Sequence, residues 1–263
     1  MMPAVHRRRL RTVLAPLFEL TVIDRRLEGV VIGTVDAEAG RLPITRFIYR
    51  GPSADLPPLR LGLFAVVHGD EPAAAETILQ LLCAVVQSPE IARGFELFCY
   101  PVCNPTGFEA GTRHNHAGAD LNREFWRGSA HPEVRALEAE LRSHGFDGVV
   151  ALHADGDSHG LYAFARGAVI VHELVEPALA AAEAVCSRNC DVTIDGFHAE
   201  NGVIRDWYPG VLGPPADQSP APFEIVLETP GQRPVSEQAE AAFKAVRGLI
   251  AAMPRLQAVG AGI

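Results

Sequence analysis

Hydrophobic positions along this chain form short apolar runs that alternate with segments of helical periodicity. The short runs predict buried strands at about 43–49, 60–67, 95–102, 147–152, 160–165 and 223–228. Helical spacing predicts helices at 72–87, after Pro132, from Leu174 to about Ser187, and from about Ser236 to Met253. This alternation indicates an α/β fold, with a mixed, largely parallel central sheet and helices on both faces.

The length and composition favour a single domain. The chain has 263 residues, of which 48% are hydrophobic, and this is enough for one substantial core. We interpret residues 1–263 as one domain with an N-terminal extension at 1–35. Residues 254–263 are predicted to be a frayed tail. The Pro- and Gly-containing segment 195–222 is predicted to be irregular.

Charge and cysteine content exclude several classes of protein. A formal net charge of −9 argues against a nucleic-acid surface, and no segment approaches the roughly 18 apolar residues of a membrane span. The run after the basic cluster at 6–11 contains Pro16 and Glu19 and makes a poor signal peptide. Five cysteines, an odd number without a zinc-ribbon pattern, suggest reduced and mostly buried thiols. We therefore expect a cytoplasmic protein without nucleic-acid or membrane partners, while its oligomeric state stays open.

Three of the predicted strands end at residues whose side chains can bind a metal ion or transfer a proton. His68 and Glu71 follow the run 60–67, His153 follows the run 147–152, and Glu228 ends the run 223–228. Parallel strands present their carboxyl ends at one edge of a sheet, where ligands bind in open α/β folds. We therefore expect these four side chains to meet, although His68-Gly69-Asp70-Glu71 alone is also compatible with a surface turn that caps a helix.

The residue types at these strand ends suit a catalytic zinc site. Two histidines and one glutamate make a three-ligand site that leaves a position open for water. The remaining glutamate has the side chain needed for a general base. The sequence thus predicts one zinc ion per chain.

The segment between the first two strand ends carries a more specific pattern. It contains Asn104-Pro105-Thr106-Gly107-Phe108, then Arg113-His114-Asn115, then Gly118-Ala119-Asp120-Leu121-Asn122-Arg123-Glu124-Phe125. With the earlier His-x-x-Glu and the later strand-end His and Glu, the chain resembles the zinc carboxypeptidase family from His68 to Glu228. Its short length and His-Gly-Asp-Glu sequence are similar to the small bacterial murein peptide amidases.

The resemblance implies a role for each matching residue. The zinc ligands would be His68, Glu71 and His153. Glu228 would be the base that activates water and later returns a proton to the leaving amine.

Three further residues would act on the substrate. The resemblance implies that Arg113 stabilises the developing oxyanion, and a preorganised cation of this kind contributes roughly 3–4 kcal/mol. It also implies that Asn122 and Arg123 hold a free carboxylate of the substrate, which suits the bidentate guanidinium fork. The alternative for Arg123 is a surface ion pair with Glu124 or Asp120.

The remaining pocket residues are less determined. Tyr208, in Asp206-Trp207-Tyr208-Pro209, is a candidate for the tyrosine that closes over substrate in the family, but it could also be a structural aromatic. Tyr162 is a second candidate, although packing in the core is the favoured interpretation for it. The polar loop after His153 could support a second metal near Asp155 or contact the substrate, and we favour the substrate loop. The side-chain pocket is expected between 155–160 and 195–222, where the charged candidates in the second segment are Glu200, Arg205 and Asp206.

The functional prediction is a zinc metallocarboxypeptidase that cleaves a small peptide or amide next to a free carboxylate. The alternative is an N-acyl amino acid deacylase of the aspartoacylase/succinylglutamate desuccinylase type, which shares the His-x-x-Glu, the Asp-Leu-Asn-Arg and the final Glu. Gly118 between Arg113 and Asn122 resembles the peptidase pattern, and the chain after Glu228 suits one helix rather than an extra β-rich domain. A non-catalytic metal-binding module is the minor alternative, disfavoured because Glu228 and Arg113 are both present.

Overall fold

A mixed β-sheet organises the molecule. The computed structural model describes residues 9–38 and 40–258. The strands of these residues are β1 (Leu27–Ala37), β2 (Gly40–Arg50), β3 (Leu59–Ala65), β4 (Phe95–Tyr100), β5 (Gly148–Asp155), β6 (Tyr162–Ala165), β7 (Thr193–Ile194), β8 (Phe197–Glu200), β9 (Val203–Ile204) and β10 (Phe223–Pro230). They form one sheet in the order β1-β2-β4-β3-β5-β10-β6-β9-β8-β7.

The centre of the sheet is parallel and its flanks are antiparallel. Strands β4, β3, β5 and β10 run in the same direction, while β2 and β6 pair antiparallel on either side of them. This confirms the predicted α/β fold with a largely parallel central sheet.

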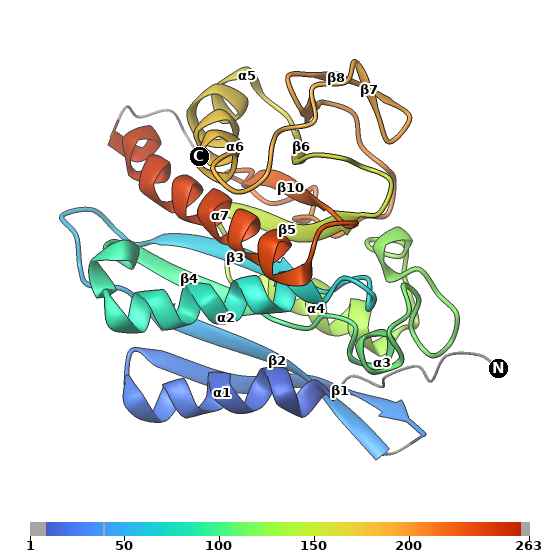
Figure 1. Cartoon of the computed structure of the whole chain (residues 1–263). Helices are drawn as coiled ribbons and strands as arrows, with labels where there is room; N and C mark the ends of the chain where they lie inside the picture. Colours follow the sequence, from blue (N-terminus) through green and yellow to red (C-terminus); the bar gives the residue numbers. More distant parts are fainter. Residues whose placement is uncertain (1–8, 39, 259–263) are drawn as a thin grey trace.

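Helices cover both faces of the sheet (Figure 1). The longer ones are α1 (Leu10–Ile23), α2 (Pro72–Gln87), α4 (Pro132–Ser143) and α7 (Val235–Ala258). The shorter ones are η1 (Pro89–Ala92), α3 (Pro105–Ala110), η2 (Leu121–Arg123), α5 (Ala168–Ile170), the π-helical turn η3 (Val171–Val175) and α6 (Glu176–Ala182). One buried cluster joins α1, α2, α6 and α7 to the sheet, and a second joins α4 to its other face.

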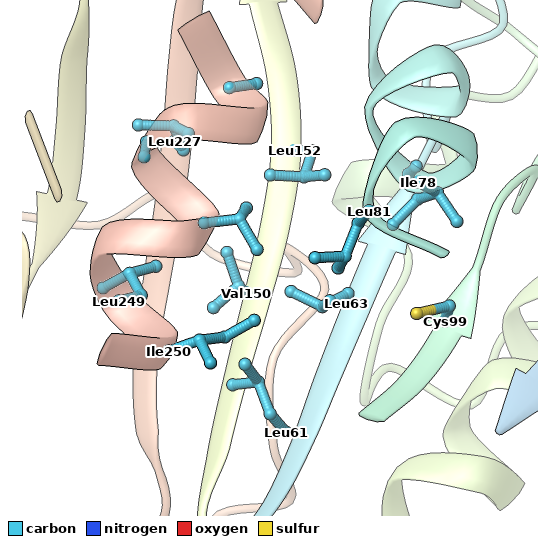
Figure 2. Close-up of a cluster of buried hydrophobic side chains, with 14 of the residues drawn as sticks. Leu61, Leu63, Ile78, Leu81, Cys99, Val150, Leu152, Leu227, Leu249 and Ile250 are labelled. Atoms are coloured by element: carbon cyan, nitrogen blue, oxygen red, sulfur yellow. The ribbon is translucent and has the colours of Figure 1, made fainter. Parts of the chain in front are cut away.

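The central strands contribute to the hydrophobic core and so fix the positions of their own carboxyl ends. Figure 2 shows alternate residues of β3 and β5 facing helices α2 and α7. The labelled core side chains from these four elements are Leu61, Leu63, Val150, Leu152, Ile78, Leu81, Leu249 and Ile250. All are at most 2% exposed, and full burial of such a side chain contributes roughly 1.5–3 kcal/mol. The strand ends that carry His68 and His153 are therefore extensions of strands that are packed in the core.

The chain termini differ in part from what the sequence suggested. Most of the predicted extension 1–35 lies in α1 and β1, and β1 continues to Ala37 and pairs along nearly the whole of β2. Residues 254–258 of the predicted tail continue helix α7. Residues 1–8, which include part of the basic cluster, and 259–263 lie outside the described residues.

Two internal predictions need correction. The first part of the segment 195–222, predicted to be irregular, holds β8 and β9, and a tight Asp195-Gly196 turn joins β8 to the preceding β7. Only 205–222 lacks regular structure. Strands of two to four residues are too short to show periodicity. The helix predicted at 174–187 instead runs from Ala168 to Ala182 through α5, η3 and α6.

All five cysteines are free, three of them buried, Cys83 half-buried and Cys190 exposed. Within 9–38 and 40–258, no helix combines the length and apolar character required to cross a bilayer.

Candidate active site

The carboxyl ends of β3, β5 and β10 bring the predicted residues together. Strands β3 and β10 flank β5 in parallel, and Glu228 is the register partner of His153. His68 lies just past the end of β3, in the turn that leads to α2. The meeting of these residues at one sheet edge follows from the topology, as the sequence predicted.

The turn that carries His68 has an unusual backbone. Val66 has a φ of 54°, in the left-handed region that β-branched residues rarely adopt. Backbone N–H groups of Cys103 and Asn104 donate to Ala65 and Val66 at 3.0 and 2.9 Å, so the next loop holds the strained turn. Such strain persists where the surroundings over-determine it, and it is common at functional sites.

Three buried side chains converge on one point. Nδ1 of His68 lies 2.6 Å from Oε1 of Glu71, and Nδ1 of His153 lies 2.9 Å from Oε2 of Glu71. The two Nδ1 atoms are 3.2 Å apart. Within the described part of the chain, these residues form the single group of three or more His, Cys, Asp and Glu side chains that can hold a metal ion.

The geometry of this group fits a tetrahedral metal. Zinc bonds of 2.0–2.1 Å at tetrahedral angles place neighbouring ligand atoms about 3.3 Å apart. The observed separations of 2.6 to 3.2 Å are close to that value, and the donors are two imidazoles and a carboxylate. Nε2 of His153 is buried and has no hydrogen-bond partner, so Nδ1 is the atom that this ring directs at the group. These residues fit the zinc ion that the resemblance implies.

The surroundings shift the pKa values of Glu71 and Glu228 in opposite directions. Burial by itself would raise the pKa of Glu71, but the adjacent His153 and His68 outweigh it and hold that pKa well below its usual range. The pKa of Glu228 is raised well above its usual range, first by burial and then by the nearby carboxylates of Glu71, Asp155 and Asp195. A carboxylate with a raised pKa binds a proton more tightly, and such shifts are common at functional sites.

Arg113 lies beside the metal group and is held by Asp120. Its Nε and Nη2 donate to Oδ2 of Asp120 at 3.1 and 2.9 Å, and its Nη1 lies 3.2 Å from Nδ1 of His68. Oδ1 of Asp120 is 3.3 Å from Nε2 of His68, although not aligned as a good hydrogen bond. Asp120 thus contacts both residues, a role that the sequence did not reveal, since we considered it only as a partner of Arg123.

Asn104 is a second residue whose role the sequence did not reveal. It is fully buried, and its Oδ1 accepts the N–H of Gly107 at 2.9 Å, which caps α3. Its Nδ2 lies 3.3 Å from the carbonyl oxygens of Val67 and Arg113, so one side chain connects the His68 turn to Arg113. A Cβ on Gly69 would lie 2.0 Å from the carbonyl carbon of Gly107, which shows how closely these loops pack. An Asn before a Pro is a recognisable signal for the start of a helix. The sequence gives no comparable signal for the contacts of Asn104 with the carbonyl groups of Val67 and Arg113.

Asn122 and Arg123 lie side by side on η2. Oδ1 of Asn122 accepts the N–H of Leu212 at 2.8 Å, which leaves the Nδ2 donors for the cavity. The guanidinium of Arg123 lies 4.4 Å from the ring centre of Tyr208. Among the described residues Arg123 has no ion pair, so the alternative of a pair with Asp120 or Glu124 is wrong.

A cavity of about 270 Å³ joins the metal group to Arg123. Besides the residues already described, its lining comes from Ala154, Asp155, Gly156, Asp157, Tyr162, Phe164, Asp195, Trp207, Tyr208, Val211 and Val226. The 155–160 loop and the 195–222 segment thus both contribute, as predicted. Glu200, Arg205 and Asp206, the expected charged candidates, do not line it, whereas Asp195 at the β7–β8 turn does. Tyr162 lines it too, but its hydroxyl donates to Asp155 at 2.9 Å.

Comparison with known proteins identifies the family. Residues 58–245 match the succinylglutamate desuccinylase/aspartoacylase catalytic domain. The chain belongs to this family. No curated protein sequence matches it.

Several solved structures with a similar fold are metallopeptidases by name. A provisionally assigned metallopeptidase from Shewanella denitrificans is 26% identical with a TM-score of 0.73, over 92% of this chain and 89% of its own. A metallo-carboxypeptidase from Burkholderia cenocepacia is 17% identical with a TM-score of 0.70, over 92% and 68%. One from Pseudomonas aeruginosa, in complex with (2-guanidinoethylmercapto)succinic acid, is 20% identical with a TM-score of 0.64, over 94% and 69%.

The comparisons confirm the carboxypeptidase-like fold and support a metal-binding hydrolase. The family match includes the deacylases that the sequence analysis kept as the alternative, so both substrate classes are compatible with it.

Proposed function

We propose that this protein is a zinc-dependent hydrolase of an amide bond next to a free carboxylate, acting as a carboxypeptidase. The observation that carries the proposal is the convergence of His68, Glu71 and His153 beside Glu228 in a cavity that also reaches Arg123. This arrangement joins a ligand set, a base and a carboxylate-binding cation in one space.

The roles of the residues follow from their positions. Zinc held by His68, Glu71 and His153 would supply a Lewis acid that lowers the pKa of a water molecule to about 7. Glu228 accepts a proton from the attacking water and passes it to the leaving nitrogen. Arg113, fixed by Asp120, stabilises the negative charge that develops on the carbonyl oxygen.

The carboxylate of the substrate would bind to Arg123 and Asn122. Arg123 forms no ion pair among the described residues, and Asn122, whose Oδ1 accepts from Leu212, lines the same cavity. A guanidinium and an amide together can satisfy both oxygens of a carboxylate.

The charge of the cavity supports a peptide more than a dicarboxylic acyl amino acid. Asp155, Asp157 and Asp195 line it and form no ion pair with an arginine or lysine of the described residues. Arg113 is already paired with Asp120. A second carboxylate on the substrate would therefore face like charges rather than a free cation.

A deacylase of N-acyl amino acids is the second candidate, because the matched family includes such enzymes by name. A panel of dipeptides, murein-type tripeptides and N-acyl amino acids separates the two. We expect cleavage of peptides, and activity confined to acyl amino acids would reverse the assignment.

Zinc content tests the common basis of both candidates. We expect about one zinc per chain in the purified protein, and loss of that zinc in His68→Ala. Much less than one zinc in both proteins would contradict the proposal, while bound zinc with no activity on any substrate of the panel would favour a binding module.

A further inference from the structure

The segment 206–213 is attached to the carboxylate-binding residues along one side. The N–H of Phe125 donates to the carbonyl of Gly210 at 3.0 Å, and Leu212 donates to the side chain of Asn122 at 2.8 Å. The indole Nε1 of Trp126 donates to the carbonyl of Gly213 at 3.0 Å. These bonds join the segment to residues 122–126, which include Asn122 and Arg123.

A hydrogen bond from Trp207 attaches the same segment to strand β10. Nε1 of Trp207 donates to Oε1 of Glu224 at 3.1 Å. A Cβ on Gly213 would lie 2.2 Å from that oxygen, so the carboxyl group is packed under the segment. Glu224 and Glu228 are four residues apart on β10 and therefore share a face of the sheet. Both tryptophans of the chain thus use their indole N–H to hold this segment.

The hydrogen bond of Trp207 limits the position of the neighbouring Tyr208 side chain. The ring of Tyr208 covers the guanidinium of Arg123 at 4.4 Å, and its hydroxyl donates to the carbonyl of Asp195 at 3.1 Å. Because Trp207 and Tyr208 are adjacent, a fixed indole limits where the phenol ring can lie. Loss of the Trp207 anchor would release the ring from the arginine that is proposed to bind the carboxylate.

We propose that Glu224 is a positioning residue for substrate binding: by accepting the Trp207 indole N–H, it holds Tyr208 against Arg123. It does not touch the reacting atoms, and its effect reaches the substrate through the 206–213 segment. This inference rests on the proposed function, because the carboxylate is assigned to Arg123.

Two substitutions at Glu224 separate positioning from general stability. Glu224→Gln keeps an acceptor for the indole, whereas Glu224→Leu removes it. A buried hydrogen bond contributes enough to change binding up to about tenfold, so we expect Glu224→Leu to raise KM by about that factor. Its kcat should stay within about twofold of the wild type, and Glu224→Gln should resemble the wild type in both constants. The inhibition constant of the released amino acid should rise in parallel with KM.

A matched control uses a carboxylate that lies, like Glu224, near the start of the paired strands β5 and β10 but bonds to a different partner. Asp147 precedes β5 and accepts the N–H of Arg60 at 2.7 Å, far from the strand ends that carry the site. Asp147→Leu should lower stability while leaving KM unchanged. Trp207→Phe removes the same bond from the other partner, and the double variant Glu224→Leu/Trp207→Phe should be no worse than either single variant.

A readout independent of activity separates this inference from the proposed function. Glu224→Leu should expose Trp207 to water, which shifts tryptophan emission to longer wavelength, and Glu224→Gln should not. Unchanged emission in Glu224→Leu, equal KM values for the Leu and Gln variants, or additive effects in the double variant would each overturn the role of Glu224. A wild-type protein that cleaves nothing while Glu224→Leu still shifts the emission would instead count against the proposed function, with the anchor itself supported.

Discussion

Two glutamates on one face of β10 have raised pKa values, and the surroundings of each explain its expected use. Glu228 lies among the carboxylates of the cavity, while Glu224 lies beneath the 206–213 segment. Burial raises the pKa of Glu224 to about 7, against a lowering by its bond to Trp207 and by Arg166. Glu228→Gln therefore tests proton transfer, whereas Glu224→Gln tests the contribution of a buried carboxyl group to stability.

Glu228→Gln should retain zinc and lose activity. The amide cannot accept a proton, and general base catalysis typically contributes about 10²–10⁴-fold, so we expect kcat to fall by at least about 100-fold. Zinc content and kcat measured on the same preparation check this. Glu71→Ala, which removes a ligand, should lose both together, and a Glu228→Gln variant that stays active would exclude this residue as the base.

Glu224 should make stability depend on pH. Its carboxyl group has a folded-state pKa of about 7 against an ordinary value of 4.5, so the folded state binds the proton more tightly. This contribution to the unfolding free energy is fully present below pH 4.5 and is lost as the pH rises to about 7. Glu224→Gln removes the dependence and should gain on the order of 2 kcal/mol relative to wild type between pH 5 and pH 8. Urea unfolding of both proteins at pH 5 and at pH 8 measures this gain. The same difference in unfolding free energy between variant and wild type at both pH values would contradict the prediction.

At the scale of the elements, Asn104 connects the loops around the site. Asn104→Ala removes the cap of α3 and leaves the carbonyls of Val67 and Arg113 without this donor. We expect a loss of about 2–4 kcal/mol in unfolding free energy. Zinc affinity should fall as well, because the His68 turn loses its support.

Asn189→Ala is the matched control for Asn104→Ala. Asn189 is also buried, and it bonds to Ser158 and Asp191 rather than to the His68 turn. It should lose stability while keeping zinc affinity. If both variants lose zinc equally, the connection through Asn104 is not specific.

The sequence predicted the elements whose signal is local. Strands β3, β5 and β10 are apolar runs that each precede a polar residue, so the edge that carries His68, His153 and Glu228 could be foreseen. Strand β1 was not foreseen, because it is a half-exposed edge strand without a continuous apolar run.

The supporting contacts of the site could not be predicted, since they join residues far apart in sequence. Leu212 meets Asn122 across 90 positions, and the Asn104 amide meets Val67 across 37. The packing of the whole chain decides such pairs, and no pattern within one segment reveals them.

For the whole molecule, zinc should stabilise the fold. Its three proposed ligands come from the turn after β3, the start of α2 and strand β5, so an ion that binds them favours the folded state over the unfolded chain. At a free concentration 1,000 times Kd, the gain is about 4 kcal/mol. We expect Tm to fall after treatment with a chelator and to recover when zinc is added. His153→Ala should show the same Tm in both conditions, and a chelator-insensitive wild type would contradict the site.

The pairing of Glu228 with His153 on adjacent strands has a consequence for protein engineering. The separation of the proposed base and ligand is set by the hydrogen-bond ladder between β5 and β10, and a shift of one residue would turn the side chains to the opposite face. By contrast, much of the wall that faces the substrate is made by the β7–β8 turn and the 205–222 loop. Exchange of those loops between homologues offers a route to new substrate preferences with the reaction centre left intact, provided that each transplanted loop brings its own anchor to β10.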